Sequence, residues 1–133
     1  MLNGAHVATR LPAQDLERAR RYYSEKLGLE PTDEREGGLL YRVASGEFAL
    51  FQSAGSSSGS FTQMAFEVDD VEAAVSELRS RGVTFEDVEL PGLETRDGIA
   101  EIAGTYPSKG KRERAAWFRD SEGNMLGVSE IIR

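Results

Sequence analysis

The side chains that could take part in chemistry fall on two short alternating stretches. Gln63 and Glu67 lie on one face of residues 61–68, because successive residues of a strand point to opposite faces. Arg10 lies on the corresponding face of an earlier stretch, residues 6–11. An arginine and a glutamate facing one hollow would hold an anionic or mixed-charge ligand, or they would only neutralise one another. The sequence leaves both alternatives open.

The single tryptophan, Trp117, is the aromatic residue that would stack on a planar ligand. It stands beside Phe118, so in a strand the two rings point to opposite faces. Stacking on a ligand and packing against a helix are both compatible with this pair. The predicted ligand-binding residues are Arg10, Gln63, Glu67 and Trp117.

The candidate acid/base residues are few. His6 is the only histidine and would be a displaced metal ligand, a general base, or a strand-end residue satisfied by backbone or water. One imidazole without a second ligand makes no metal site, which favours the last alternative. Glu67 and Glu101 are conceivable acid/base residues, because an apolar hollow raises the pKa of a carboxyl group toward neutrality.

Composition excludes several function classes. The chain has 133 residues and no cysteine, which rules out disulfides and thiolate chemistry. Its net charge of −7 repels polyphosphate, so nucleic acid is not expected as a partner, whereas a cationic small molecule would be attracted. The sequence contains neither a phosphate-binding glycine motif, nor a signal peptide, nor an apolar run long enough to cross a membrane. We therefore expect a cytoplasmic protein with no cofactor.

Two helices are predicted from apolar residues that recur every three or four positions. The first covers residues 15–27 and ends at Gly28, which can adopt the left-handed cap. The second follows Asp69 as its N-cap, with Glu72 in a capping box. Besides 6–11 and 61–68, the predicted strands are residues 39–44, 48–53, 83–88, 98–103, 115–119 and 125–131.

The two halves of the chain repeat each other. Superposing Asp15 on Asp70 gives an offset of 55 residues, with a glycine closing each unit at Gly28 and Gly82. The Gly/Ser segment 54–60 is a flexible connection by composition. We predict an α+β fold of two βαβββ modules, residues 1–60 and 61–133, in one compact domain. A module with one helix cannot cover both faces of its sheet, so the sheets should combine around a shared concavity.

Three segments carry a family resemblance: DLERARRYYSEKLGLEP, MAFEVDDVEAAVSELRSRGV and WFRDSEGNMLGV. Together they resemble the vicinal oxygen chelate superfamily, which contains glyoxalase I, extradiol dioxygenases, and the fosfomycin- and bleomycin-resistance proteins. The resemblance implies a cupped, incomplete barrel with a small-molecule site in the cup, and a homodimer.

The resemblance also implies a divalent metal. The superfamily's enzymes hold it with a histidine that begins each module's first strand and a glutamate in a module's last strand. These positions fall on Ala8 and Gln63 for the histidines, and on Gly127 and a position near Leu50 for the glutamates. Alanine, glycine and leucine side chains cannot bind a metal, whereas a catalytic site needs three protein ligands. We therefore predict the cup without a metal.

The leading hypothesis is a metal-free protein of the bleomycin-resistance type that sequesters a small molecule, such as an antibiotic, in its cup. The alternative is a lyase, isomerase or dioxygenase-type enzyme, with a relocated metal on His6, Gln63 and Glu67 or a carboxylate acid/base. A third hypothesis is a cup filled by its own side chains, in a protein that acts through its surface.

Overall fold

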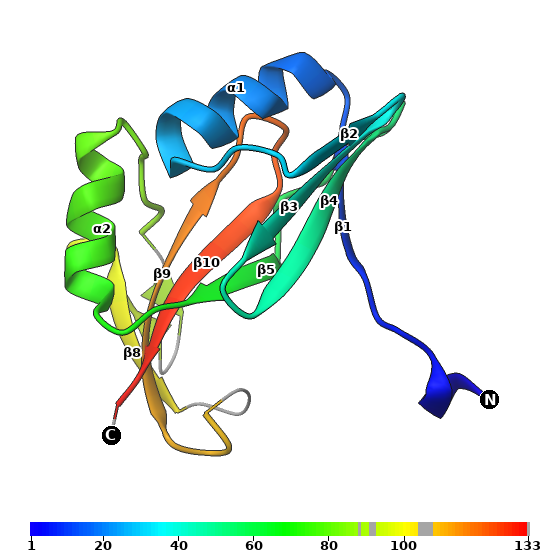
Figure 1. Cartoon of the computed structure of the whole chain (residues 1–133). Coiled ribbons are helices and arrows are strands. Elements are labelled where there is room, and N and C mark those ends of the chain that lie inside the picture. Colours follow the sequence, from blue (N-terminus) through cyan, green and yellow to red (C-terminus); the bar gives the residue numbers. More distant parts are fainter. Residues whose placement is uncertain (88, 91–92, 104–107, 133) are drawn as a thin grey trace.

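The computed structural model describes residues 1–87, 89–90, 93–103 and 108–132. These residues form two four-stranded sheets, a short two-stranded hairpin and two α-helices (Figure 1). Within these ranges the two large sheets do not join into a closed barrel. The predicted α+β fold of two βαβββ modules around an open cup is confirmed.

The first module forms a sheet in the order β1-β4-β3-β2, with β1 parallel to β4. Its elements are β1 (Thr9–Ala13), α1 (Leu16–Leu27), β2 (Asp33–Arg35), β3 (Gly38–Val43) and β4 (Gly46–Gln52). Strand β1 is an edge strand, and this position tolerates Pro12, which has no N–H to donate. The strand predicted from residue 6 begins only at Thr9.

The second module forms a sheet in the order β5-β10-β9-β8. Its elements are β5 (Thr62–Glu67), α2 (Val71–Ser80), β8 (Ile99–Ala103), β9 (Arg112–Arg119) and β10 (Met125–Ile131), with the hairpin β6 (Glu89–Leu90) and β7 (Leu93–Glu94) before β8. The strand predicted over residues 83–88 is wrong, since residues 83–87 make only one bridge, from Phe85 to Phe118. Residue 88 lies outside the described residues.

Both helices begin at an aspartate. The Asp15 carboxylate accepts a hydrogen bond from the Arg18 N–H at 2.9 Å, and α1 ends at Gly28 in the left-handed conformation, as predicted. Helix α2 begins one residue later than predicted, because Asp70 and not Asp69 is the N-cap. Asp70 has extended dihedrals and accepts from the Ala73 N–H at 3.0 Å. Within the described residues, neither helix is long and apolar enough to span a bilayer.

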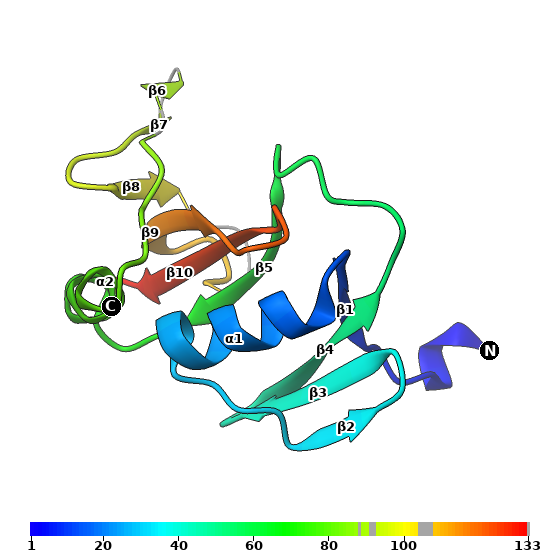
Figure 2. The ribbon, with the colours of Figure 1, turned by 90° about the horizontal axis from the view of Figure 1, so that it is seen from above.

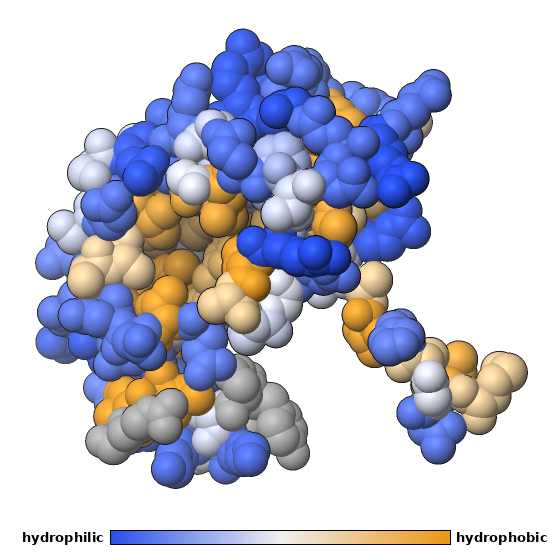
Figure 3. All heavy atoms as spheres, viewed as in Figure 1, coloured by the Kyte–Doolittle hydropathy of each residue, from blue (hydrophilic) through white to orange (hydrophobic). Residues whose placement is uncertain are grey.

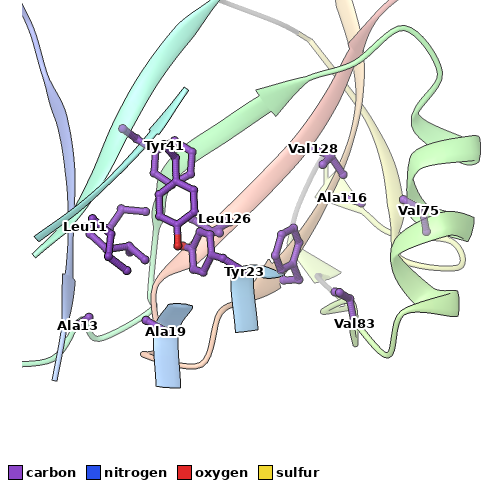
Figure 4. Packing of buried hydrophobic residues seen from close by; sticks show 14 of the residues in the cluster. Leu11, Ala13, Ala19, Tyr23, Tyr41, Val75, Val83, Ala116, Leu126 and Val128 are labelled. Carbon is purple, nitrogen blue, oxygen red and sulfur yellow. The ribbon is translucent and has the colours of Figure 1, made fainter. Parts of the chain in front are cut away.

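One apolar core joins the two modules. The Tyr23 ring of α1 lies against Tyr41 and Phe48 of the first sheet. Phe48 meets Phe66 of the second sheet edge-on, with ring centroids 6.0 Å apart. Figure 4 shows the cluster continuing from Tyr41 past Tyr23 to Val128, and Figure 2 shows α1 lying over the junction of the two sheets. The sheet faces turned away from the helices are therefore the open faces.

The Gly/Ser connection is anchored to the turn between β9 and β10. Arg119 donates a hydrogen bond to the Gly59 carbonyl at 3.2 Å, and the Ser57 hydroxyl donates to Gln63. Gly59 is buried at a φ of 67°, and a Cβ there would lie 2.7 Å from the Gly123 carbonyl oxygen. Only glycine fits this close approach.

The N-terminal arm, residues 1–8, is exposed throughout. It contains a short 3-10 turn, Leu2–Gly4, and the side chain of Val7 is 98% exposed. Figures 1 and 2 show the arm extending away from both sheets.

Candidate functional site

The orientation of Trp117 follows from the register of the second sheet. Gly127 of β10 lies opposite Trp117 of β9 and Ala65 of β5. A Cβ at Gly127 would stand 3.5 Å from the Ala65 Cβ and 3.5 Å from the Trp117 Cδ1 atom, so all three residues share one face. Phe118 points the other way into the core and is fully buried. The half-buried indole of Trp117 thus lies on the open face beside Gly127, with Ala65 on the strand beyond it.

The side chain of Gln63 connects the Gly/Ser segment, the β9–β10 turn and the first residue of β10. Its side-chain oxygen accepts from the Ser57 hydroxyl and from the Met125 N–H at 3.2 Å, and its amide donates to the Asn124 side-chain oxygen at 3.1 Å. Both ends of the amide are therefore occupied by protein groups. The side chain is fixed at the edge of the open face and has little freedom to bind a ligand directly.

Glu67 and Glu101 lie on opposite faces of the second sheet. Glu67 lies opposite Ser129 in the register, is exposed, and has no partner among the described residues. Glu101 lies on the helix side, where it pairs with Arg112 at 2.8 Å beside Arg114, which itself pairs with Glu72 of α2. The structure separates the two conceivable acid/base residues and leaves only Glu67 on the open face.

Arg10 lies on the open face of the first sheet, because its neighbour Leu11 points into the core. Its guanidinium carbon lies 5.0 Å from the centroid of the Phe51 ring, a cation–π contact. Within the described residues Arg10 makes no ion pair, so Glu67 does not neutralise it. The charge is held over an aromatic ring on the open face.

His6 is not brought to the open face of a strand. It lies in the exposed N-terminal arm, ahead of the first residue of β1. Among the described residues no group of three or more His, Cys, Asp or Glu side chains could hold a metal ion. Of the residues considered for a relocated site, His6 comes from the arm, whereas Gln63 and Glu67 come from β5.

The metal positions implied by the resemblance carry no suitable donor set. Ala8 precedes β1 and is exposed. Leu50 itself is fully buried in the core. The register identifies Ala49 instead, since it lies opposite Arg10 as Gly127 lies opposite Ala65. Gln63 is the only one of these residues with a donor atom, and the residues present do not fit the metal.

A buried polar network at the β9–β10 turn was not predicted from the sequence. Asp120 accepts from the Tyr23 hydroxyl at 2.7 Å, and Asn124 donates to the Pro12 carbonyl at 3.0 Å. Glu122 receives two hydrogen bonds from Arg18, at 2.8 and 3.0 Å. These contacts tie the turn to β1 and α1. The segment DSEGN could have indicated them, because it places carboxylates on both sides of a tight turn.

This network perturbs two ionisable groups. Burial raises the pKa of Tyr23 well above its usual value, and the neighbouring Asp120 carboxylate raises it further. Burial of Glu122 acts to raise its pKa, but the hydrogen bonds from Arg18, the Asp15 N–H and the Ser121 hydroxyl outweigh it and lower the pKa to about 2. Both groups hold the modules together and lie away from the open face.

Two cavities lie on the helix side of the second sheet. One, of about 960 Å³, lies between α2, the segment that connects β7 to β8, and β9, and is lined largely by charged side chains. The other, of about 240 Å³, is apolar and lies between the two helices. The four residues predicted to bind a ligand line neither of them.

Comparison with known proteins identifies relatives of the whole chain. Residues 5–128 match the family model described as Glyoxalase/Bleomycin resistance protein/Dioxygenase superfamily. A comparison with curated proteins finds no match.

Solved structures share the fold at low sequence identity. A glyoxalase/bleomycin resistance protein/dioxygenase from Nocardioides is 20% identical, with a TM-score of 0.65 over 97% of this chain and 84% of that one. A virulence protein from Salmonella typhimurium is 18% identical, with a TM-score of 0.67 over 99% and 100% of the two chains. A glyoxalase/bleomycin resistance protein/dioxygenase from Alicyclobacillus acidocaldarius is 14% identical, with a TM-score of 0.68 over 98% and 93%.

Proposed function

The chain belongs to the glyoxalase/bleomycin resistance protein/dioxygenase superfamily, and we propose that it binds a small organic molecule in its cup without the divalent metal that the superfamily's enzymes use. The observation that carries this proposal is the set of residues at the metal positions. Ala8, Ala49 and Gly127 have no donor atom, and the amide of Gln63 is already bonded at both ends.

The ligand class follows from the side chains of the open face. Trp117 offers an indole beside Gly127, and Ala65 lies on the next strand beyond Gly127. These two small residues leave room beside the ring for a planar molecule to stack. Arg10 and Glu67 add one charge of each sign, and neither forms an ion pair among the described residues. A planar molecule with polar or charged substituents suits this surface, and the role that fits it is sequestration, such as that of an aromatic antibiotic. We expect the protein to act as a cytoplasmic homodimer.

Metal analysis tests the proposal that the protein binds no divalent metal. Protein purified in the presence of nickel, zinc, iron and manganese salts and then dialysed should retain far less than one metal ion per chain by mass spectrometry. Stoichiometric metal that survives dialysis would overturn this part of the proposal.

Tryptophan fluorescence tests the ligand part, because Trp117 is the only tryptophan in the chain. In a screen of planar aromatic compounds, a ligand that stacks on the indole should quench the emission saturably. The variant Trp117→Leu should bind that compound about tenfold more weakly, because it loses about 1.4 kcal/mol of stacking energy. Since this variant has no tryptophan, its binding is measured by thermal shift.

A matched pair of charge variants separates the site from the rest of the surface. Glu67→Gln should alter affinity for charged ligands, whereas Glu36→Gln, at an exposed residue of the β2–β3 turn, should not. If a compound binds equally well to the wild type, to Trp117→Leu and to Glu67→Gln, its binding site lies elsewhere. That result would contradict the proposed site.

A further inference from the structure

The apolar cavity between the helices lies outside the proposed site. Its walls come from the end of α1, the β3–β4 hairpin, β5, α2, β9 and β10, and its volume is about 240 Å³. The residues that the argument uses are Leu27, Val43, Phe66, Ala74, Leu78 and Val128. Figure 3 shows a hollow of hydrophobic surface at this place, bordered by hydrophilic residues of both helices.

The lining determines what kind of molecule fits. Glu77 is the only polar residue among those that line the cavity, and its carboxylate already pairs with Arg81 at 3.1 Å. A ligand would therefore meet no free hydrogen-bonding side chain and must itself be uncharged and apolar. An apolar cavity of about 150 Å³ is enough to hold benzene, so 240 Å³ admits a substituted single ring.

The ends of the two helices meet beside this hollow. A Cβ at Gly28, which ends α1, would lie 3.3 Å from the Arg81 guanidinium, which caps α2. A Cβ at Gly82 would lie 2.5 Å from the Lys26 Nζ atom. The helix ends thus meet through long charged side chains. Val128 at the floor of the hollow is buried in the core, whereas Leu27 and Leu78 pack against that core and stay partly exposed.

The apolar surface is concave, which favours a small molecule over a protein partner. Of the large apolar side chains that are exposed among the described residues, only Val43 belongs to the cavity, at 37% exposure. The others line the hollow without protruding. A protein interface needs about 800 Å² on each partner, and the hydrophilic border in Figure 3 limits the apolar area to the hollow itself.

We infer that this cavity is a second binding site, specific for a neutral apolar molecule the size of a substituted benzene ring, and separate from the cup. The inference does not depend on the proposed function, because the two sites lie on opposite sides of the second sheet. Toluene serves as the probe. At ten times its dissociation constant, a bound ring should raise the melting temperature by about 4 °C.

Two alanines of α2 give a matched pair of variants. Ala74 lines the cavity and Ala73 is exposed, so Ala74→Leu fills the space while Ala73→Leu adds the same side chain outside it. Toluene should stabilise the wild type and Ala73→Leu equally and should lose its effect on Ala74→Leu. An equal response of all three proteins would place the probe elsewhere and overturn the inference.

Nuclear magnetic resonance of the wild type gives a readout that does not depend on any variant. The methyl signals of Leu78 and Val128 should shift saturably with toluene and show direct magnetisation transfer from its ring. The absence of saturable shifts would overturn the inference. Shifts of these methyls with protein concentration alone, without toluene, would show that a second copy covers the cavity, and would overturn it as well.

Discussion

At the scale of single residues, the hydroxyl groups of Tyr23 and Tyr41 differ although their rings lie against each other. The Tyr23 hydroxyl donates to Asp120 at 2.7 Å, whereas that of Tyr41 is buried without a partner among the described residues. Tyr23→Phe should therefore lower the free energy of unfolding by about 2 kcal/mol, because a buried carboxylate loses a hydrogen bond. Tyr41→Phe should be neutral or stabilising by up to about 1 kcal/mol.

Urea denaturation of the two variants checks this prediction. The same phenylalanine replaces the same residue type in the same cluster, so differences in packing largely cancel. An equal loss of stability in both would mean that the Tyr41 hydroxyl has a partner, such as a buried water, in solution.

Glu122 should make the stability of the fold depend strongly on pH in the acidic range. Its pKa is about 2 in the folded protein against 4.5 for the free side chain. Since the folded-state value is lower, the ionised form stabilises the fold above pH 4.5, and this contribution, of about 3 kcal/mol, is lost as the pH falls toward 2. Glu122→Gln should be less stable than wild type at pH 7 and should lose less of its stability on acidification.

Chemical denaturation at a series of pH values between 7 and 2 measures the effect. Glu36→Gln, at an exposed site, is the control and should follow the wild-type curve. Parallel curves for wild type and Glu122→Gln would show that other carboxyl groups dominate the acid response.

At the scale of elements, the two aspartates before α2 differ in their role. Asp70 caps the helix by accepting from the Ala73 N–H, and Asp69 makes no such bond. Asp70→Ala should cost about 1 kcal/mol of stability and increase hydrogen exchange in the first turn of α2, whereas Asp69→Ala should stay within about 0.5 kcal/mol of wild type. A larger effect of Asp69→Ala would reverse the assignment of the cap.

The elements with strong local signals could be predicted from the sequence. Helix α1 was predicted with its cap at Gly28, because its apolar spacing and its terminal glycine act locally. Strand β10 was predicted with the bounds that the structure shows. Strand β2 was missed because Asp33–Arg35 has no apolar residue to reveal it, and only its pairing with β3 makes it a strand.

The candidate site was less predictable, because it depends on pairing between distant strands. Whether Trp117 or Phe118 faces the core could not be decided until the register placed Gly127 beside Trp117. The glutamate counterpart could be placed only near Leu50 for the same reason, since a shift of one residue in a strand moves a side chain to the other face. The partners of Gln63 lie up to 62 residues away and leave no local pattern.

At the scale of the whole molecule, the two modules stabilise each other. The Tyr23 hydroxyl and the Arg18 guanidinium bind the β9–β10 turn, and Phe48 packs on Phe66. Residues 1–60 alone should therefore be largely unfolded, because Tyr23 and the apolar face around it would be exposed to water without the second module. Mixing this fragment with residues 61–133 should restore the circular dichroism spectrum of the intact chain.

The intact protein should also unfold in a single transition seen equally by Trp117 fluorescence and by circular dichroism. A fragment 1–60 that folds cooperatively by itself would contradict the mutual dependence of the modules.

The hydrogen bonds of Gln63 set a cost for placing a metal-binding histidine at this position. A histidine at this position would supply the missing imidazole, but it would release the Ser57 hydroxyl, the Asn124 side chain and the Met125 N–H from the group that gathers them. The imidazole that would bind an ion and the amide that holds the linker therefore compete for one position. A histidine variant would need other hydrogen bonds to keep the linker attached to the second sheet.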